Sequence, residues 1–249
     1  YPIKVNQQRH LVEAMVKVGH ETGLGLEAGS KPELLVALAL LDNPEALLIC
    51  NGFKDKEYIE TALLASRVGR NVLIVIDRFQ ELPPPRQVAK RLDIKPRSGF
   101  RAKLENKGAG KWVDSSGPRS KFGLTALEMV EGIDILKRDG MMDCLQLLHF
   151  HIGSQVPNIL TIKNAVVEAT RFYCQLAKMG FPMGYLDVGG GLGIDYDGSR
   201  TNFESSMNYS MEEYARDVVF NIREICRASG VPDPDIVSES GRAVVAQHS

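Results

Sequence analysis

The sequence predicts an α/β fold, a (β/α)8 barrel of the TIM type that is truncated at both ends. Short runs rich in aliphatic and β-branched residues alternate with longer amphipathic stretches along the whole chain. Strands that alternate with helices form a parallel sheet with right-handed crossovers. The pattern holds eight such strands in 249 residues, and eight units in about 250 residues close a barrel. An open doubly wound sheet is the alternative.

Each predicted strand is a short apolar run that ends at or beside a polar or glycine residue. The strands lie at residues 1–6, 24–28, 46–51, 72–77, 99–104, 145–152, 185–188 and 236–239. The helices between them carry apolar residues three and four positions apart. They include residues 7–18, 31–41, 55–68, 125–138, 159–179 and 211–228. Three prolines at 83–85 are typical of an exposed helix start. The chain begins without methionine inside a predicted strand, so we expect a fragment.

The composition excludes several classes of protein. Thirty basic residues balance thirty-one acidic ones, so no strong charge draws the protein to nucleic acid or to a membrane surface. The four cysteines form no CxxC pair, which favours buried reduced thiols over disulfides or zinc. The sequence shows neither a membrane-spanning stretch nor a signal peptide, so we expect a cytoplasmic protein. No linker divides residues 1–249, which are expected to form one domain.

Polar and charged residues follow most of the predicted strands. The active site of a TIM-type barrel lies at the carboxyl ends of its strands. The residues at these ends are Lys4, Glu27, Asn51, Asp77, Arg101, His151, Gly189–Gly191, Glu239 and Arg242. Few of these residue types are typical of a core, so the sequence predicts a functional site there.

Lys4 lies in the first predicted strand, where the period of two places Tyr1, Ile3 and Val5 on the opposite face. If the apolar face meets the helices, Lys4 points into the barrel. Desolvation there would lower the pKa of its ammonium group and favour the free amine that forms an imine. The alternative is an exposed lysine at a strand end.

A glycine run at Gly189–Gly191 follows the seventh predicted strand. Three residues without side chains allow backbone N–H groups to approach an anion. Ile194 stands where a dinucleotide fingerprint has its third glycine. Gly241 and Arg242 follow the eighth strand, and phosphate sites in such barrels use the loops after strands seven and eight. The sequence therefore predicts a phosphate site in which Arg242 hydrogen bonds to the phosphate. A flexible turn without a ligand is the alternative.

Glu239 ends the eighth predicted strand, where a carboxylate can keep a pyridine nitrogen protonated beside the phosphate site. An ion pair with Arg242 is the alternative. His149 and His151 share one face of the sixth strand; His151 can stack on a ring or move a proton, and Ser154 can bind a phosphate oxygen. The alternative is a pair of core histidines. Spacing indicates no third ligand for a metal.

Together these residues resemble the family of pyridoxal phosphate-dependent basic amino-acid decarboxylases with an alanine-racemase-like barrel. Within it, the segments are most similar to the large biosynthetic arginine decarboxylases. The segments that carry the resemblance span nearly the whole chain, at residues 1–7, 25–31, 50–55, 120–123, 149–155, 187–193 and 239–242.

The resemblance implies a pyridoxal 5'-phosphate cofactor joined to Lys4 as a Schiff base. The residues that it assigns to the cofactor are His151 for the ring, Glu239 for the ring nitrogen, and Ser154, Gly189–Gly191, Gly241 and Arg242 for the phosphate. Glu27 and Arg101 resemble the charged residues near the lysine and the cofactor's phenolic oxygen.

The implied activity is decarboxylation of L-arginine to agmatine and CO2 on the route to polyamines such as spermidine. Ornithine, lysine and diaminopimelate are alternative substrates. The resemblance places a protonating cysteine and the substrate-selecting acidic residues in a C-terminal β domain that this chain lacks, supplied across a homo-oligomer, and it suggests Mg²⁺.

Two rival hypotheses are a non-catalytic cofactor carrier and an aldolase-like barrel in which Lys4 reacts with a sugar phosphate. The glycine-bearing loop 105–120 is a predicted lid.

Overall fold

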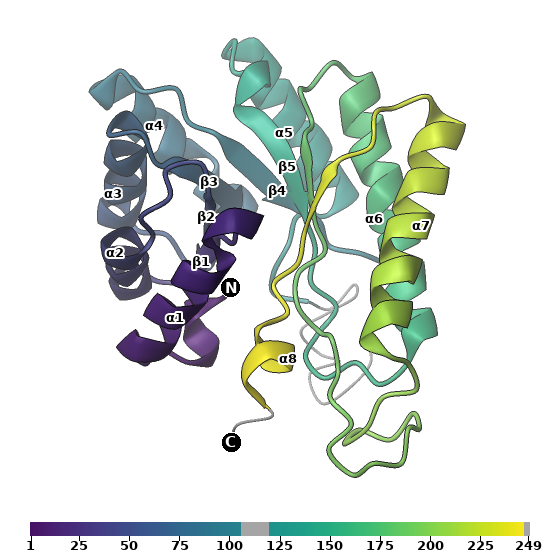
Figure 1. The fold of residues 1–249 in the computed structure, drawn as a ribbon. Helices are drawn as coiled ribbons and strands as arrows, with labels where there is room; N and C mark the ends of the chain where they lie inside the picture. Colours follow the sequence, from purple (N-terminus) through teal and green to yellow (C-terminus); the bar gives the residue numbers. More distant parts are fainter. Residues whose placement is uncertain (106–119, 247–249) are drawn as a thin grey trace. The chain divides into compact units, whose positions relative to one another are not determined.

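Parallel strands separated by helices run through the computed structural model, which describes residues 1–105 and 120–246 (Figure 1). The chain divides into two units, Tyr1–Gly99 and Phe100–Ser249, and each is described by itself. The expected single domain over residues 1–249 stays a prediction. The predicted lid at 105–120 lies almost entirely outside the described residues.

The first unit carries three parallel strands in chain order. Strand β1 pairs with β2, and β2 pairs with β3, with Glu27 opposite Ile49. Helix α2 contacts β1, and α3 packs against both β3 and α4. The elements are η1 Ile3–Val5, α1 Arg9–Gly19, η2 His20–Thr22, β1 Leu26–Ala28, α2 Lys31–Leu40, β2 Leu47–Cys50, α3 Lys56–Arg67, β3 Asn71–Ile76, η3 Phe79–Glu81 and α4 Pro83–Leu92. Strand β4, Ser98–Arg101, crosses the boundary between the units.

The second unit repeats the same arrangement. Strands β5, β6 and β7 are parallel and pair in chain order, so His149 lies opposite Asp187, and Asp187 lies opposite Val237. Helices α6 and α7 pack side by side (Figure 1). The elements are α5 Ala126–Arg138, η5 Met142–Cys144, β5 Leu145–His149, α6 Ile159–Lys178, β6 Tyr185–Asp187, α7 Met211–Ser229, β7 Asp235–Val237 and α8 Gly241–Val245. The predicted alternation of strand and helix is confirmed.

The predicted strand at 1–6 is wrong. Pro2 makes an isolated bridge to Glu27, whose N–H donates to Tyr1 O at 2.8 Å. The N–H of Val5 then donates back to Pro2 O at 3.3 Å, which closes a 3-10 turn. Proline has no N–H to offer a sheet ladder. The predicted placement of Ile3 and Val5 on the same face of a strand is also wrong, because Ile3 is fully buried while Val5 is 39% exposed.

Most of the other strands are shorter than predicted, and two of these differences concern candidate site residues. Strand β5 ends at His149 and β7 ends at Val237, so His151 and Glu239 lie in the loops beyond the strands. Gly153 has φ +117°, a conformation that glycine adopts without steric cost. These loops carry the residues expected to be functional.

Local signals set the helix ends. Helix α7 begins with a capping box, in which Ser210 Oγ accepts from the Glu213 N–H at 3.1 Å and the Glu213 carboxylate accepts from the Ser210 N–H at 2.8 Å. The helix stops at Gly230, which is left-handed at φ +66°. Helix α4 begins with the three prolines, as predicted.

The core of the first unit is apolar, with a few buried polar groups. Tyr58 is 1% exposed, and its hydroxyl donates to Ala28 O at 2.8 Å, which ties α3 to β1. Burial raises the pKa of Tyr58 above its usual range. Burial also raises the pKa of Cys50 to about 12, so this thiol stays protonated near neutral pH.

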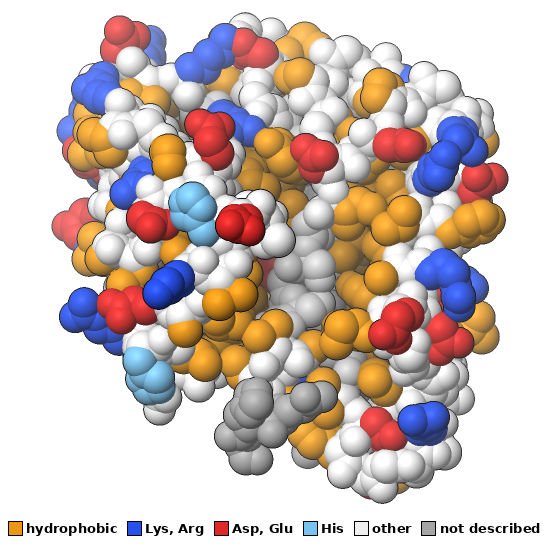
Figure 2. Space-filling model, in the orientation of Figure 1, with side chains coloured by type: hydrophobic (Ala, Val, Ile, Leu, Met, Phe, Trp, Pro, Cys, Tyr) orange, Lys and Arg blue, Asp and Glu red, His pale blue; other side chains and the backbone are white. Residues whose placement is uncertain are grey.

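The four cysteines are free and buried, as predicted. No helix in the described ranges 1–105 and 120–246 is long and apolar enough to cross a membrane. On the face that Figure 2 shows, acidic and basic side chains are interspersed, which agrees with the near-zero net charge.

We expect the substitution Ser210→Ala to lower the free energy of unfolding by about 1 kcal/mol, because the first turn of α7 loses a side-chain acceptor. Urea titration followed by circular dichroism measures this change. Ser229→Ala, at the other end of the same helix, is the matched control and is expected to leave the free energy of unfolding unchanged or slightly raised, because alanine has a higher helix propensity than serine. Equal unfolding energies for the two variants would contradict the capping role.

Candidate active site

The first unit places Lys4 beside a buried carboxylate. Lys4 Nζ lies 3.8 Å from Glu27 Oε2, and the Glu27 side chain is only 3% exposed. The hydrogen bond from Glu27 to Tyr1 fixes the turn that carries Lys4 next to β1. The Lys4 side chain is 58% exposed, which agrees with the alternative of an exposed lysine rather than with a desolvated one. Its pairing with a buried anion was not predicted from the alternation, although the resemblance places Glu27 near the lysine.

The second unit holds the glycine run in a tight turn after β6. Gly189 and Gly191 are left-handed, at φ +65° and +109°. A Cβ on Gly189 would lie 2.3 Å from Phe150 O, and one on Gly190 would lie 3.0 Å from Glu239 O. Glycine is therefore required where the backbone of this turn meets the loops after β5 and β7.

Backbone hydrogen bonds connect this turn to both neighbouring loops. The Glu239 N–H donates to Gly189 O at 2.8 Å, and the Gly241 N–H donates to Glu239 O at 2.8 Å. The Gly190 N–H donates to His151 Nδ1 at 3.3 Å, which leaves the proton of a neutral imidazole on Nε2. The structure thus brings His151, Glu239 and the glycine run together.

Arg242 is held in a fixed orientation by two hydroxyl groups. Its NH2 donates to Ser154 Oγ at 3.0 Å, and its NH1 donates to Tyr196 OH at 2.9 Å. Its Nε is buried and has no hydrogen-bond partner within the described part of the chain. Ser154 and Arg242, which the resemblance assigns to one phosphate group, therefore lie in contact. The alternative of an ion pair between Glu239 and Arg242 is not among the ion pairs found in the described residues.

A cluster of titratable side chains lies at the ends of β5 and β6, and two of them, His149 and Asp187, are buried. His149 Nδ1 is 2.9 Å from Asp187 Oδ2, with side chains 3% and 0% exposed. Asp187 also accepts from the Gly189 N–H at 2.8 Å through its other oxygen. One ligand-type atom each from His149, Asp187 and Glu239 lie within 4.8 Å of one another. Asp187 therefore joins the glycine turn to His149, and the carboxylate of Glu239 lies nearby.

Arg101 ends β4, where its guanidinium group lies 5.2 Å from the centre of the Phe122 ring. The Leu124 N–H donates to Arg101 O at 2.7 Å. These contacts attach Arg101 to the segment just before α5.

Sequence reasoning missed Asp187, Gln155 and Tyr196. Gln155 is left-handed at φ +55° and clamps Ile194, donating to its carbonyl oxygen at 2.6 Å and accepting from its N–H at 3.0 Å. This clamp fixes the loop that carries Ser154. Gln155 and Asp187 stand in the segments that carry the resemblance, but they received no role there. Nothing in the sequence near Tyr196 signals its contact with Arg242.

A family model described as "Pyridoxal-dependent decarboxylase, pyridoxal binding domain" matches residues 1–246. The chain belongs to this family. The resemblance noted from the sequence is confirmed, and so is the expected cofactor, pyridoxal phosphate.

Curated relatives match the whole chain. It is 54% identical over 249 residues to a biosynthetic arginine decarboxylase from Thermosynechococcus vestitus and 57% identical to one from Gloeobacter violaceus. The chain spans 39% of the length of each of these relatives.

Solved structures share the fold. A biosynthetic arginine decarboxylase from Campylobacter jejuni matches 98% of this chain and 40% of its own, with a TM-score of 0.86 and 38% identity. A diaminopimelate decarboxylase from Helicobacter pylori, in complex with L-lysine, matches 99% of this chain and 57% of its own, with a TM-score of 0.78. At 23% identity the second match concerns the fold alone. The predicted fold class, a truncated α/β barrel of the pyridoxal phosphate-binding type, is confirmed.

We expect Gly189→Ala to destabilise the protein more than Gly198→Ala. Both glycines are left-handed, at φ +65° and +73°, so both variants incur a strain of about 1–2 kcal/mol. A Cβ on Gly198 meets nothing within 4 Å, whereas the clash with Phe150 O at position 189 adds roughly 1–3 kcal/mol. Thermal unfolding with and without pyridoxal phosphate measures the difference, and equal midpoints would show that the turn is not sterically constrained.

Proposed function

We propose that this chain is the cofactor-binding part of a decarboxylase that converts L-arginine to agmatine and CO2 in polyamine biosynthesis. Identity of 54% and 57% over its whole length to relatives named biosynthetic arginine decarboxylase supports the substrate. The observation that carries the proposal is the constellation of Arg242, Ser154 and the glycine run after β6, because it provides oriented donors for the phosphate of the cofactor.

The described residues fit a phosphate group. Arg242 is already oriented by Ser154 and Tyr196, and its buried Nε is a donor without a partner in the described structure. A buried donor of this kind calls for an acceptor. Arg242 and Ser154 would bind the phosphate oxygens, together with backbone N–H groups of Gly189–Gly191 and Gly241.

Glu239 would hold a proton at the ring nitrogen, and His151 would pack against the ring. When bound, pyridoxal phosphate supplies a ring that accepts the electron pair left by the departing CO2. An anionic Glu239 stabilises that proton by charge. Its backbone is fixed by the hydrogen bond to Gly189 O, and the buried pair of His149 and Asp187 lies beside its carboxylate. We assign these two residues a positioning role.

Lys4 would attach the cofactor covalently through its amine. Glu27, 3.8 Å away, is the anion that holds the Lys4 ammonium group in place. The buried position of Glu27 strengthens this attraction, because solvent screens it less than at the surface. Arg101, whose guanidinium group packs on the Phe122 ring, would lie near the phenolic oxygen of the cofactor.

The rival hypotheses have less support. Of the alternative substrates, diaminopimelate is supported by a structural neighbour at 23% identity, which shares the fold alone. A carrier without catalysis would need the same cofactor residues, so only activity separates it from the proposed enzyme. The aldolase-like barrel leaves Glu239 without a role. The expected homo-oligomer, the Mg²⁺ and the cytoplasmic location stay predictions.

The test uses the full-length protein and its Lys4→Ala variant, loaded with pyridoxal phosphate, reduced with borohydride and mapped by peptide mass. We expect a stable adduct on Lys4 and CO2 release from L-arginine in the unsubstituted protein, and neither in Lys4→Ala. Lys17→Ala, at an exposed position of α1, is the matched control.

Three outcomes separate the hypotheses. An adduct on Lys4 without CO2 from any basic amino acid favours the carrier. Faster release of CO2 from ornithine, lysine or diaminopimelate than from arginine corrects the substrate. A natively folded protein that forms no adduct with pyridoxal phosphate overturns both cofactor hypotheses.

We expect Arg242→Lys to weaken pyridoxal phosphate binding by roughly tenfold. Lysine keeps the positive charge but lacks the planar guanidinium group, whose N–H donors can bind two phosphate oxygens at once. Absorbance titration of the apoprotein gives the dissociation constant. Arg227→Lys is the control, because Arg227 is exposed and pairs only loosely with Glu224 at 3.8 Å. An unchanged constant in Arg242→Lys would remove Arg242 from the phosphate site.

A further inference from the structure

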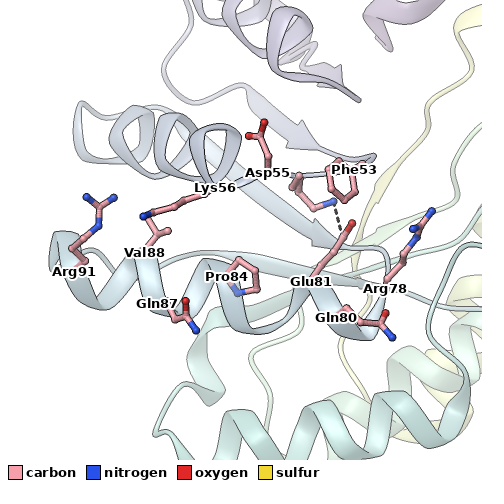
Figure 3. Close-up of a pocket in the computed structure, with 11 residues that line it drawn as sticks. Phe53, Asp55, Lys56, Arg78, Gln80, Glu81, Pro84, Gln87, Val88 and Arg91 are labelled. Atoms are coloured by element: carbon pink, nitrogen blue, oxygen red, sulfur yellow. Dashed lines mark ion pairs between the residues drawn. The ribbon is translucent and has the colours of Figure 1, made fainter.

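The first unit contains a cavity of about 730 Å³ between α3, α4 and the loops after β2 and β3 (Figure 3). None of the residues proposed above for pyridoxal phosphate lines it. Its volume lies within the range of roughly 300–1,000 Å³ that is typical of small-molecule sites. The family match and the proposed reaction leave this cavity without a role.

A buried carboxylate with an unused oxygen forms one side of the cavity. Glu81 is 6% exposed, and its Oε2 accepts from the Asp77 N–H at 3.0 Å and pairs with Lys54 Nζ at 3.1 Å. The Lys54 side chain is 0% exposed. Glu81 Oε1 is buried and has no hydrogen-bond partner within the described residues. Buried acceptors are normally satisfied, so this oxygen calls for a donor from a ligand.

The cavity lining is positively charged overall. Four cationic side chains line it, namely Lys54, Lys56, Arg78 and Arg91, against the two carboxylates of Asp55 and Glu81. In Figure 3, Lys56 and Arg91 lie at the end away from Glu81. The first three residues of α4 are prolines, which have no N–H to bind an anion. The start of α4 therefore offers no backbone N–H group to an anion, whereas the cationic side chains of the lining do offer contacts.

An aromatic ring completes the end of the cavity near Glu81. Phe53 is 72% exposed although it is a large apolar side chain, and it lies beside Glu81 in Figure 3. Val88 and Pro84 add apolar surface along the wall between the two ends. A planar ligand group can stack on such an exposed ring.

We propose that this cavity binds a nucleoside phosphate. The base stacks on Phe53 and donates an N–H to Glu81 Oε1, and the phosphate lies against Lys56 and Arg91. One class of ligand then supplies a donor for Glu81 Oε1, a planar group for Phe53 and an anion for the cationic end of the cavity. A polyamine can donate a hydrogen bond to Glu81 Oε1, but its positive charges are repelled by the positively charged lining of the cavity.

The test is calorimetric titration of the full-length holoenzyme with AMP, with the pyridoxal phosphate site kept saturated. Gln87→Trp fills the cavity from an exposed position of α4 that lines it. Lys90→Trp, also exposed on α4 but outside the lining, is the matched control. We expect AMP to bind the unsubstituted protein and Lys90→Trp equally, and Gln87→Trp at least roughly tenfold more weakly.

Two further titrations test the two ends of the ligand. Ribose 5-phosphate lacks the base and is expected to bind roughly tenfold more weakly than AMP, since a base contact of this kind is worth about one decade or more. Lys56→Ala is expected to weaken the binding of AMP more than the binding of adenosine, because only AMP carries the phosphate charge.

The proposal is overturned if AMP does not bind at millimolar concentration, or if Gln87→Trp leaves its binding unchanged. It is also overturned if ribose 5-phosphate binds as well as AMP, or if spermidine binds in a manner that Gln87→Trp abolishes. None of these readouts depends on decarboxylation, so they stand apart from the tests of the proposed function.

Discussion

The close approach of three backbone segments at the glycine turn is the constraint on which the second unit depends. Phe150 O and Glu239 O leave no room for a Cβ at Gly189 and little at Gly190. Any larger residue would push apart the loops that carry His151 and Glu239. The turn therefore fixes the loops after β5 and β7 against each other, and with them the orientation of the side chains proposed to hold the cofactor.

Buried acidic groups beside the ends of strands are the second organising feature. Glu27 pairs with Lys4, Glu81 with Lys54, and Asp187 with His149. A buried carboxylate is costly unless a cation or donors compensate it. Each pair lies next to a loop rather than in the middle of the apolar core. The fold thus places fixed charge where the chain leaves its strands, which is also where ligands meet α/β sheets.

Much of the candidate site could be predicted from the sequence, because glycine runs, terminal arginines and polar strand ends are local signals. The resemblance assigns both Ser154 and Arg242 to the phosphate, and these side chains, 88 positions apart in sequence, are joined by a 3.0 Å hydrogen bond. Alternation left open whether Lys4 points inward or is exposed, and the exposed position is observed. Alternation also presumes a strand. Pro2 and the turn at Ile3–Val5 end the ladder after one bond.

The sequence by itself determined the order of strands and helices, their approximate ends, and which residues carry chemistry, since periodicity, caps and turn residues act over a few positions. Only the tertiary structure decided which of those residues become partners. Asp187 meets His149 through the register of β5 and β6, and Tyr196 meets Arg242 across a long loop. The cavity beside Glu81 likewise exists only through the packing of α3 on α4. Contacts of this kind depend on how separate elements pack, and no local pattern encodes that.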